Sequence, residues 1–204
     1  GSAWIGGRGA LVRVRGERPE DVGTAVGFPT SATVHSLAQS KGGCLWVGTQ
    51  DALYCLKGDT LRHWTVADGL PVGQVRALLP LADGRLWIGT YGGGIECFDG
   101  TRIRKVAVDQ GLMNNAVSRI DLDSSNRVWA NTNLGAFSMR LEDLDAVVSG
   151  KASVLSCYPA RTGEAGGPSG VMVDGRALLL PPVYGVTMLD LGIVEPPPVA
   201  PGIL

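Results

Sequence analysis

The chain has 204 residues, of which 45% are hydrophobic and 18% are charged, and this is enough for one sizeable buried core. A formal net charge of −1 argues against a broad electrostatic grip on nucleic acid. The 30 Gly and 12 Pro residues are poorly tolerated inside helices and are typical of turn-rich sheet proteins. The most apolar stretch, 177–194, contains Pro181, Pro182 and Asp190, so we expect no membrane-spanning helix in this segment.

Two markers recur along the chain in one register. Tryptophans in the stretches GSAWIGG, GCLWVGT, GRLWIGT and NRVWANT are spaced by 42, 41 and 42 residues, at Trp4, Trp46, Trp87 and Trp129. A valine lies 12 residues before each of the last three, at Val34, Val75 and Val117. A fifth, weaker copy at 174–190 aligns without a gap to 83–99 and has Leu178 in place of the tryptophan. We therefore predict repeats at about 1–33, 34–74, 75–116, 117–165 and 166–194, with a Pro-rich tail or linker at 195–204.

The third repeat predicts four short strands, at 75–81, 85–90, 94–99 and 102–108, with turn signals between neighbours. Four antiparallel strands in a unit of this length are typical of a propeller blade, whose faces are buried by stacking against adjacent blades. The fold prediction is all-β, a β-propeller segment of about four to five four-stranded blades. Trp4, Trp46, Trp87 and Trp129 are predicted to fill the core between blades. The first copy lacks an inner strand and a clear outer one.

Two local features depart from plain sheet. The glycines at 92–94 run directly into a strand and not into a helix, which excludes a phosphate-binding loop and predicts a turn with positive φ. Gly48 and Gly89 each follow a tryptophan by two residues, which predicts close approach of a neighbouring sheet. In the fourth repeat, Leu141, Leu144 and Val148 share a helical spacing, so we expect a short inserted helix at 141–150.

The repeat at 69–100, GLPVGQVRALLPLADGRLWIGTYGGGIECFDG, resembles the two-component regulator propeller repeat. Stretches 27–57 and 111–139 are similar, and EPPPVAP at 195–201 resembles the family's passage into an immunoglobulin-like domain. The resemblance implies the C-terminal part of a larger, seven-bladed propeller. It also implies a periplasmic, extracytoplasmic sensor in an inner-membrane signal transduction regulator, whose output domain is a histidine kinase or a diguanylate cyclase. Implied partners are the remaining blades, the immunoglobulin-like domain, a carbohydrate or other small ligand and, in the full-length protein, a dimer partner.

Binding is favoured over catalysis, because no nucleophile–base set and no metal cluster is recognisable; we expect no cofactor and no catalytic residue. Loops at one face of a propeller commonly bind ligands, and here they carry amides, a carboxylate and a phenol that suit sugar hydroxyls. Ordinary turn chemistry is the competing explanation for these residues. The ligand-binding candidates are Asp51, Gln74, Tyr91, Asn114 and Asn133.

The histidines and cysteines are assigned no chemistry. We expect His35 and His63 at surface or edge positions. Cys55 and Cys97 lie in apolar, strand-like runs and are expected to be core thiols, although the sequence leaves a disulfide open. The functional hypothesis is a ligand-sensing, signal-relaying propeller; a non-signalling interaction scaffold and a polysaccharide-degrading propeller enzyme are the alternatives.

Overall fold

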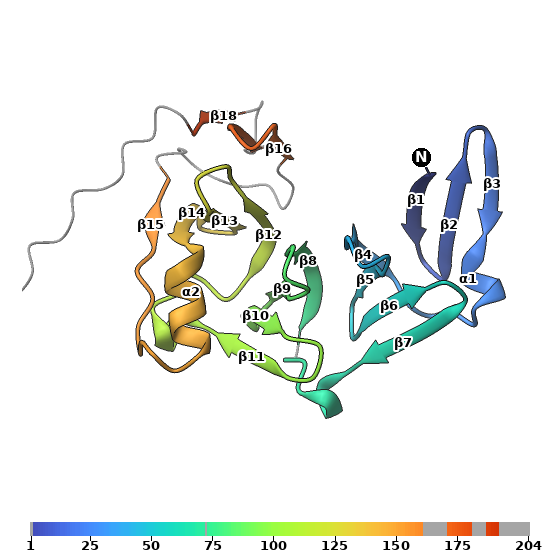
Figure 1. The fold of residues 1–204 in the computed structure, drawn as a ribbon, viewed down its shortest axis with the longest axis horizontal. Coiled ribbons are helices and arrows are strands. Elements are labelled where there is room, and N and C mark those ends of the chain that lie inside the picture. The colour runs from blue at the N-terminus through green and yellow to red at the C-terminus, as the bar shows by residue number, and fades with distance from the viewer. Residues whose placement is uncertain (1, 72, 161–170, 181–186, 192–204) are drawn as a thin grey trace, which may run out of the picture.

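In a computed structural model, which describes residues 2–71, 73–160, 171–180 and 187–191, the chain forms five separate antiparallel sheets. Figure 1 shows these sheets following one another around an arc, with β4, β8 and β12 toward its inner side. Strand order within each sheet follows chain order, so every sheet is a simple meander. This is the β-propeller architecture predicted from the repeat.

The elements are assigned to sheets as follows. The first sheet contains β1 (Ser2–Gly7), β2 (Ala10–Arg15) and β3 (Arg18–Asp21), and the second contains β4 (Val34–Gln39), β5 (Leu45–Thr49), β6 (Leu53–Lys57) and β7 (Thr60–Trp64). The third contains β8 (Gln74–Pro80), β9 (Leu86–Tyr91), β10 (Gly94–Phe98) and β11 (Ile103–Val106). The fourth contains β12 (Val117–Leu122), β13 (Arg127–Thr132), β14 (Gly135–Arg140) and β15 (Tyr158–Pro159), and the fifth contains β16 (Val171–Val173), β17 (Ala177–Leu180) and β18 (Thr187–Asp190). The helices are α1 (Val22–Ala25) and α2 (Leu141–Val148), and 3₁₀ turns cover Val66–Asp68 and Val108–Gln110.

The second, third and fourth sheets have the expected four strands, and the end sheets differ. Among the described residues, the first sheet begins with the tryptophan strand β1, and no strand on its inner side is seen there. An outer strand, β3, is nevertheless present, contrary to our expectation. Its sequence, RPED, is exposed throughout and has no apolar alternation that could have revealed it. In the fifth sheet, Leu178 lies on the middle strand β17. The predicted tail at 195–204 lies outside the described residues.

The Gly–Leu pairs that precede Val75 and Val117 each end a 3₁₀ turn. Gly69 and Gly111 cap the two 3₁₀ turns in the left-handed region, at φ 95° and 93°. This conformation is easily reached only by glycine and turns the chain back toward the core. The leucines that follow, Leu70 and Leu112, are buried in successive inter-sheet clusters.

Each marker tryptophan lies in a different inter-sheet cluster. Trp4 is half-buried against the cluster between the first and second sheets, and Trp46 is in the cluster between the second and third. Trp87 is fully buried between the third and fourth sheets, and Trp129 packs with Leu178 between the fourth and fifth. The repeat spacing of the tryptophans therefore matches one indole ring per sheet interface.

The glycines after the tryptophans have the steric role predicted for them. A Cβ built on Gly89 would lie 2.8 Å from Val117 Cγ1, so the marker valine of the next repeat packs directly on this glycine. In the turn at 92–94, Gly92 and Gly94 have positive φ as expected. Gly93 does not; it is needed for space, because a Cβ there would lie 2.4 Å from Thr90 Oγ1.

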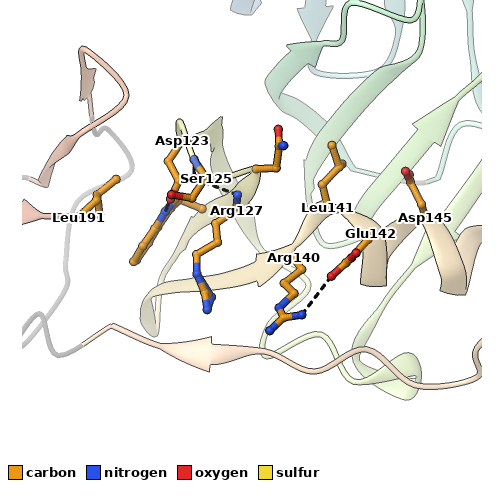
Figure 2. A pocket seen from close by; sticks show the side chains of 10 residues that line it. Asp123, Ser125, Arg127, Arg140, Leu141, Glu142, Asp145 and Leu191 are labelled. Carbon is orange, nitrogen blue, oxygen red and sulfur yellow. Dashed lines mark hydrogen bonds and ion pairs between the residues drawn. The ribbon is translucent and has the colours of Figure 1, made fainter. Parts of the chain in front are cut away.

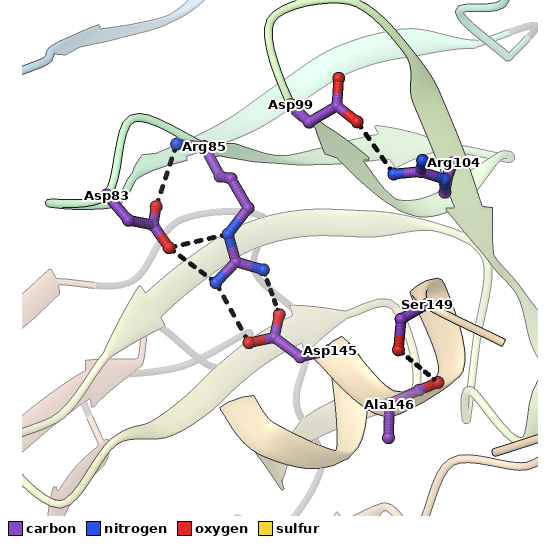
Figure 3. Close-up of polar contacts among 7 residues, drawn as sticks. All are labelled: Asp83, Arg85, Asp99, Arg104, Asp145, Ala146 and Ser149. Atoms are coloured by element: carbon purple, nitrogen blue, oxygen red, sulfur yellow. Dashed lines mark hydrogen bonds and ion pairs between the residues drawn. The ribbon is translucent and has the colours of Figure 1, made fainter. Parts of the chain in front are cut away.

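The helix predicted at 141–150 is α2, which directly follows β14 and packs on β11 and β14. Leu144 is fully buried in the core between the third and fourth sheets. Arg85, at the start of the third sheet's tryptophan strand, forms an ion pair with Asp145 of α2 (Figure 3). The inserted helix is thus attached to the preceding sheet by both apolar and charged contacts.

The cysteines partly correct the sequence-based expectation. Cys97 is a buried free thiol, as expected. Cys55 is not a free thiol, because it forms a disulfide with Cys44, with Cα atoms 5.7 Å apart. Cys44 directly precedes β5 and Cys55 lies on β6, so the β5–β6 hairpin brings them together although they are 11 residues apart.

Candidate ligand-binding site

The inner strands of three consecutive sheets have the same irregularity. The pairing of β4, β8 and β12 with the next strand shifts by one residue directly after the marker valine. The residues left out of the ladder are His35, Arg76 and Ser118. A bulge redirects side chains and often lies beside a functional site, so these positions identify the inner side of the arc as a candidate site.

The three bulges border one hollow of about 350 Å³ between the inner strands. Its charged residues are Arg76 from β8 and Arg119 and Asp121 from β12. Arg119 donates two hydrogen bonds to the Asp121 carboxylate, at 2.6 and 2.9 Å. These two charges therefore neutralise each other within the same strand.

His35 lies on β4 beside this hollow. Burial, and secondly the positive charge of Arg76, lower the pKa of its imidazole from 6.5. The imidazole is therefore neutral at pH 7. His35 Nε2 is buried and has no hydrogen-bond partner among the described residues. His35 is half-buried on β4, an edge strand of the second sheet, so the expected edge position is confirmed, and the structure adds that the residue borders the hollow. His63, on β7 at the opposite edge of the same sheet, is exposed as expected.

Arg76, which lines the hollow, also belongs to a polar cluster that connects the third and fourth sheets. Asn133 Nδ2 donates to Tyr91 Oη at 2.6 Å, between residues at equivalent positions of consecutive repeats. The Arg76 guanidinium lies 5.6 Å from the centroid of the Tyr91 ring, and Arg76 Nε donates to Gln74 Oε1 at 2.8 Å. Three of the five candidates from the sequence, Gln74, Tyr91 and Asn133, therefore meet around Arg76.

The other two candidates bond within their own turns. Asp51 Oδ1 accepts a hydrogen bond from Thr49 Oγ1 at 3.1 Å, and Asn114 Oδ1 accepts one from the Ala116 amide at 2.6 Å. Asn114 still flanks the cluster, because Ala116 forms a bridge with Tyr91. These contacts correspond to the turn chemistry that was the competing explanation for both residues.

Arg76 was not among the candidates predicted from the sequence, and His35 was expected at an edge but not beside a candidate site. Both directly follow a marker valine, so their equivalence was visible in the repeat register. The bulge that turns them toward the hollow was not visible, because a one-residue shift in pairing reverses which side chains face inward.

A larger cleft of about 710 Å³ lies at the β12–β13 turn and the start of α2, next to Leu191 after β18 (Figure 2). Apart from Arg127, its charged side chains already have partners: Arg140 donates to Glu142, Asp145 binds Arg85, and Asp123 accepts from the indole of Trp129. The guanidinium of Arg127 lies 5.6 Å from the centroid of the Tyr158 ring, and its Nη1 is buried without a hydrogen-bond partner among the described residues. This cleft is larger than the hollow beside Arg76, but none of the five candidates predicted from the sequence lines it.

No group of three or more His, Cys, Asp or Glu side chains among the described residues is placed to hold a metal ion. No helix in the part of the chain that the structure describes is long and apolar enough to cross a membrane.

Comparison with protein families gives one match. The model of the two-component regulator propeller matches residues 69–92, which include the turn after Gly69, Gln74, Arg76 and Tyr91. A comparison with curated protein sequences gives no significant match.

Solved propellers resemble the chain in fold. The extracellular domain described for a hybrid two-component system of B. thetaiotaomicron aligns with a TM-score of 0.62 and 15% identity, over 93% of this chain and 32% of that one. PorZ, a surface component of the type-IX secretion system of Porphyromonas gingivalis, aligns with a TM-score of 0.68 and 15% identity, over 93% and 31%. Virginiamycin B lyase from Staphylococcus aureus gives 0.66 and 16%, over 93% and 66%. The chain spans about a third of the first two proteins and about two thirds of the lyase, and identities this low show a shared fold alone.

Proposed function

We propose that this chain, which contains a two-component regulator propeller repeat at residues 69–92, is the ligand-sensing module of a membrane-bound two-component-type signal transduction regulator. The observation that carries the proposal is the Tyr91–Asn133 hydrogen bond, with Arg76 and Gln74 beside it, across two neighbouring sheets. A carbohydrate or other small polar ligand bound here contacts both sheets at once.

Signal relay follows from that position. Each sheet is held to the next by a packed apolar interface and by few polar links. A ligand that binds one relative arrangement of the third and fourth sheets more tightly shifts the population toward it. The remaining blades and a following immunoglobulin-like domain pass this change to the output domain. In this proposal the segment itself is not catalytic, uses no cofactor and does not bind nucleic acid.

A periplasmic location is part of the proposal. The Cys44–Cys55 disulfide supports it, because disulfides persist in oxidising compartments and are rare in the cytosol. The B. thetaiotaomicron domain with the same fold is described as extracellular.

The test is calorimetric titration of the full-length protein with a panel of oligosaccharides, combined with a reporter of its signalling output. We expect Tyr91→Ala and Asn133→Ala to weaken both binding and output. His63→Ala, on the exposed outer strand β7, is the control and should change neither. Absence of binding by every glycan, together with unchanged output in both variants, would exclude ligand sensing at this site.

A protein-binding scaffold is a second candidate, favoured by exposed apolar side chains in the loops at the same end of the sheets. Val108, Met113 and Leu134 are exposed by 51%, 41% and 76%. Clustered exposed apolar residues of this kind often mark protein contacts. Leu134→Ser combined with Met113→Ser should then abolish copurification of a partner while leaving glycan binding intact, whereas the sensor proposal expects no loss of partner.

A further inference from the structure

We propose that the hollow between β4, β8 and β12 recognises a carboxylate, with Arg76 as its anion-binding residue, and that the ligand is an acidic sugar. The inference rests on the proposed sensing function and specifies the chemical class of ligand at the same site.

The charges in the hollow favour an anionic ligand. Of the two arginines in the hollow, Arg119 is neutralised by Asp121. Arg76 forms no ion pair with any residue that the structure describes; its hydrogen-bond acceptor is the neutral amide oxygen of Gln74. His35 is neutral at pH 7 for the reasons given above. The hollow therefore contains one positive charge that its neighbours leave uncompensated. A partly buried charge of this kind is stabilised by a bound anion.

The hydrogen bonds of Arg76 leave one edge of its guanidinium for a carboxylate. Gln74 Oε1 accepts from Nε and from one terminal nitrogen of Arg76, so it occupies one edge of the guanidinium. The edge formed by the two terminal nitrogens remains for another acceptor. The guanidinium also lies over the Tyr91 ring, 5.6 Å from its centroid, so two neighbouring side chains contact it. A planar carboxylate fits a fixed guanidinium edge with two parallel hydrogen bonds.

The groups near Arg76 suit the remainder of a sugar. The phenol of Tyr91 lies beside Arg76 and the amide of Asn133 beside Tyr91, and both can donate to and accept from hydroxyl groups. The hollow's volume of about 350 Å³ is near the lower limit for small-molecule sites, which suits one sugar residue better than a long chain. A hydroxyl-rich ligand with a single carboxylate satisfies both parts of the site.

The test is titration calorimetry of the full-length protein with glucuronate and galacturonate, using glucose and inorganic phosphate as the comparison ligands. We expect the uronates to bind, glucose to bind at least about tenfold more weakly, and added salt to weaken uronate binding. Arg76→Gln should reduce uronate affinity by about tenfold or more, and Arg76→Lys by less, because lysine keeps the charge and loses the paired hydrogen bonds. Arg104→Gln, whose arginine pairs with Asp99 in the third sheet's outer hairpin, is the matched control and should bind like the wild type.

The outcomes separate this inference from the sensing proposal. Equal affinity for glucuronate and glucose, wild-type uronate affinity in Arg76→Gln, or no uronate binding at millimolar concentration would overturn the carboxylate site. Each of these results leaves sensing of a neutral glycan intact. Preferential binding of phosphate would assign the hollow to phosphorylated ligands and also overturn the inference.

If Arg76→Gln fails to fold by circular dichroism, Arg76→Lys and the salt dependence in the wild type decide the question. Uronate binding that depends on Arg76 but leaves signalling output unchanged would support the site and contradict the sensing function.

Discussion

Gly48 on β5 lies directly against Val75 on the inner strand of the next sheet. A Cβ built on Gly48 would lie 2.5 Å from Val75 Cγ1, 2.7 Å from the Val75 carbonyl oxygen and 2.3 Å from Ser36 Oγ. The two sequence markers, glycine after tryptophan and valine at the start of the inner strand, are therefore the two sides of one contact. This contact sets how closely consecutive sheets approach.

Gly48→Ala should destabilise the protein. The added methyl group meets backbone as well as side-chain atoms, so the two sheets must separate, and overpacking of this kind typically costs about 1–3 kcal/mol. The measurement is the free energy of unfolding in urea. Gly42→Ala is the matched control, because its Cβ would meet nothing closer than 3.9 Å, at Ser40 Oγ. Equal stability of the two variants would show that the Gly48–Val75 contact does not limit sheet spacing.

The Cys44–Cys55 disulfide predicts two reactive thiols in the unreduced, denatured protein, Cys97 and Cys157. Mass spectrometry after alkylation should therefore find two modified cysteines before reduction and four after it. Cys44→Ser with Cys55→Ser should lower the free energy of unfolding by about 2–3 kcal/mol, as expected for a short closed loop. Cys97→Ser is the control for loss of a sulfur without a disulfide. Four alkylated cysteines in unreduced protein purified from an oxidising compartment would contradict the assignment.

Sequence analysis predicted the sheets, the inserted helix and the close approach at Gly89, because each depends on a periodic or local pattern. The repeat register gave the strands of the third sheet, and the spacing of Leu141, Leu144 and Val148 gave α2. The contacts that were not predicted, such as Cys44 with Cys55 and Arg85 with Asp145, join residues that are separated in sequence. No local pattern in the sequence shows that such residues lie close together.

The candidate site, like the fold, was predicted in part. Loop position on one face identified Gln74, Tyr91 and Asn133, which the structure brings together around Arg76. The inward direction of Arg76 depends on the bulge after Val75, which reverses the alternation expected from the strand pattern.

The ion pair between Arg85 and Asp145 should stabilise the docking of α2 on the third sheet (Figure 3). One terminal nitrogen of Arg85 lies 3.1 Å from an Asp145 oxygen, a second makes a shorter contact, and the same guanidinium also binds Asp83. Because both side chains are partly shielded, with 28% and 35% exposed, we expect a coupling energy of about 1 kcal/mol.

The measurement is a double-mutant cycle with Arg85→Ala and Asp145→Ala, followed by urea unfolding. The more exposed Arg140–Glu142 pair, at 55% and 72%, is the comparison and should give a smaller coupling energy. Additive effects of the two alanine variants would show that α2 is held by its apolar face alone.

Glu96 should make stability depend on pH. It is fully buried on β10, opposite Ile88 and Lys105 in the ladder, and burial raises the pKa of its carboxyl from 4.5 to about 8. The Thr90 hydroxyl, which donates to Glu96 Oε1 at 3.1 Å, and the charge of Lys105 act in the opposite direction and are weaker. The folded state therefore holds a proton that the unfolded state releases between pH 4.5 and about 8. The stabilisation from this proton is complete below the pKa that Glu96 has in the unfolded chain, and it is lost as pH rises through the pKa that Glu96 has in the folded protein.

We expect the wild type to lose roughly 3 kcal/mol of unfolding free energy from this residue between about pH 5 and pH 8. The Glu96→Gln side chain cannot ionise, so the variant's unfolding free energy should vary less over that range. The difference in unfolding free energy, variant minus wild type, should therefore increase from about pH 5 to pH 8. Urea unfolding at several pH values measures both curves. Glu142→Gln, an exposed carboxylate on α2, is the control and should keep the wild-type slope. Parallel curves for wild type and Glu96→Gln would show that Glu96 is not the residue whose proton links folding to pH.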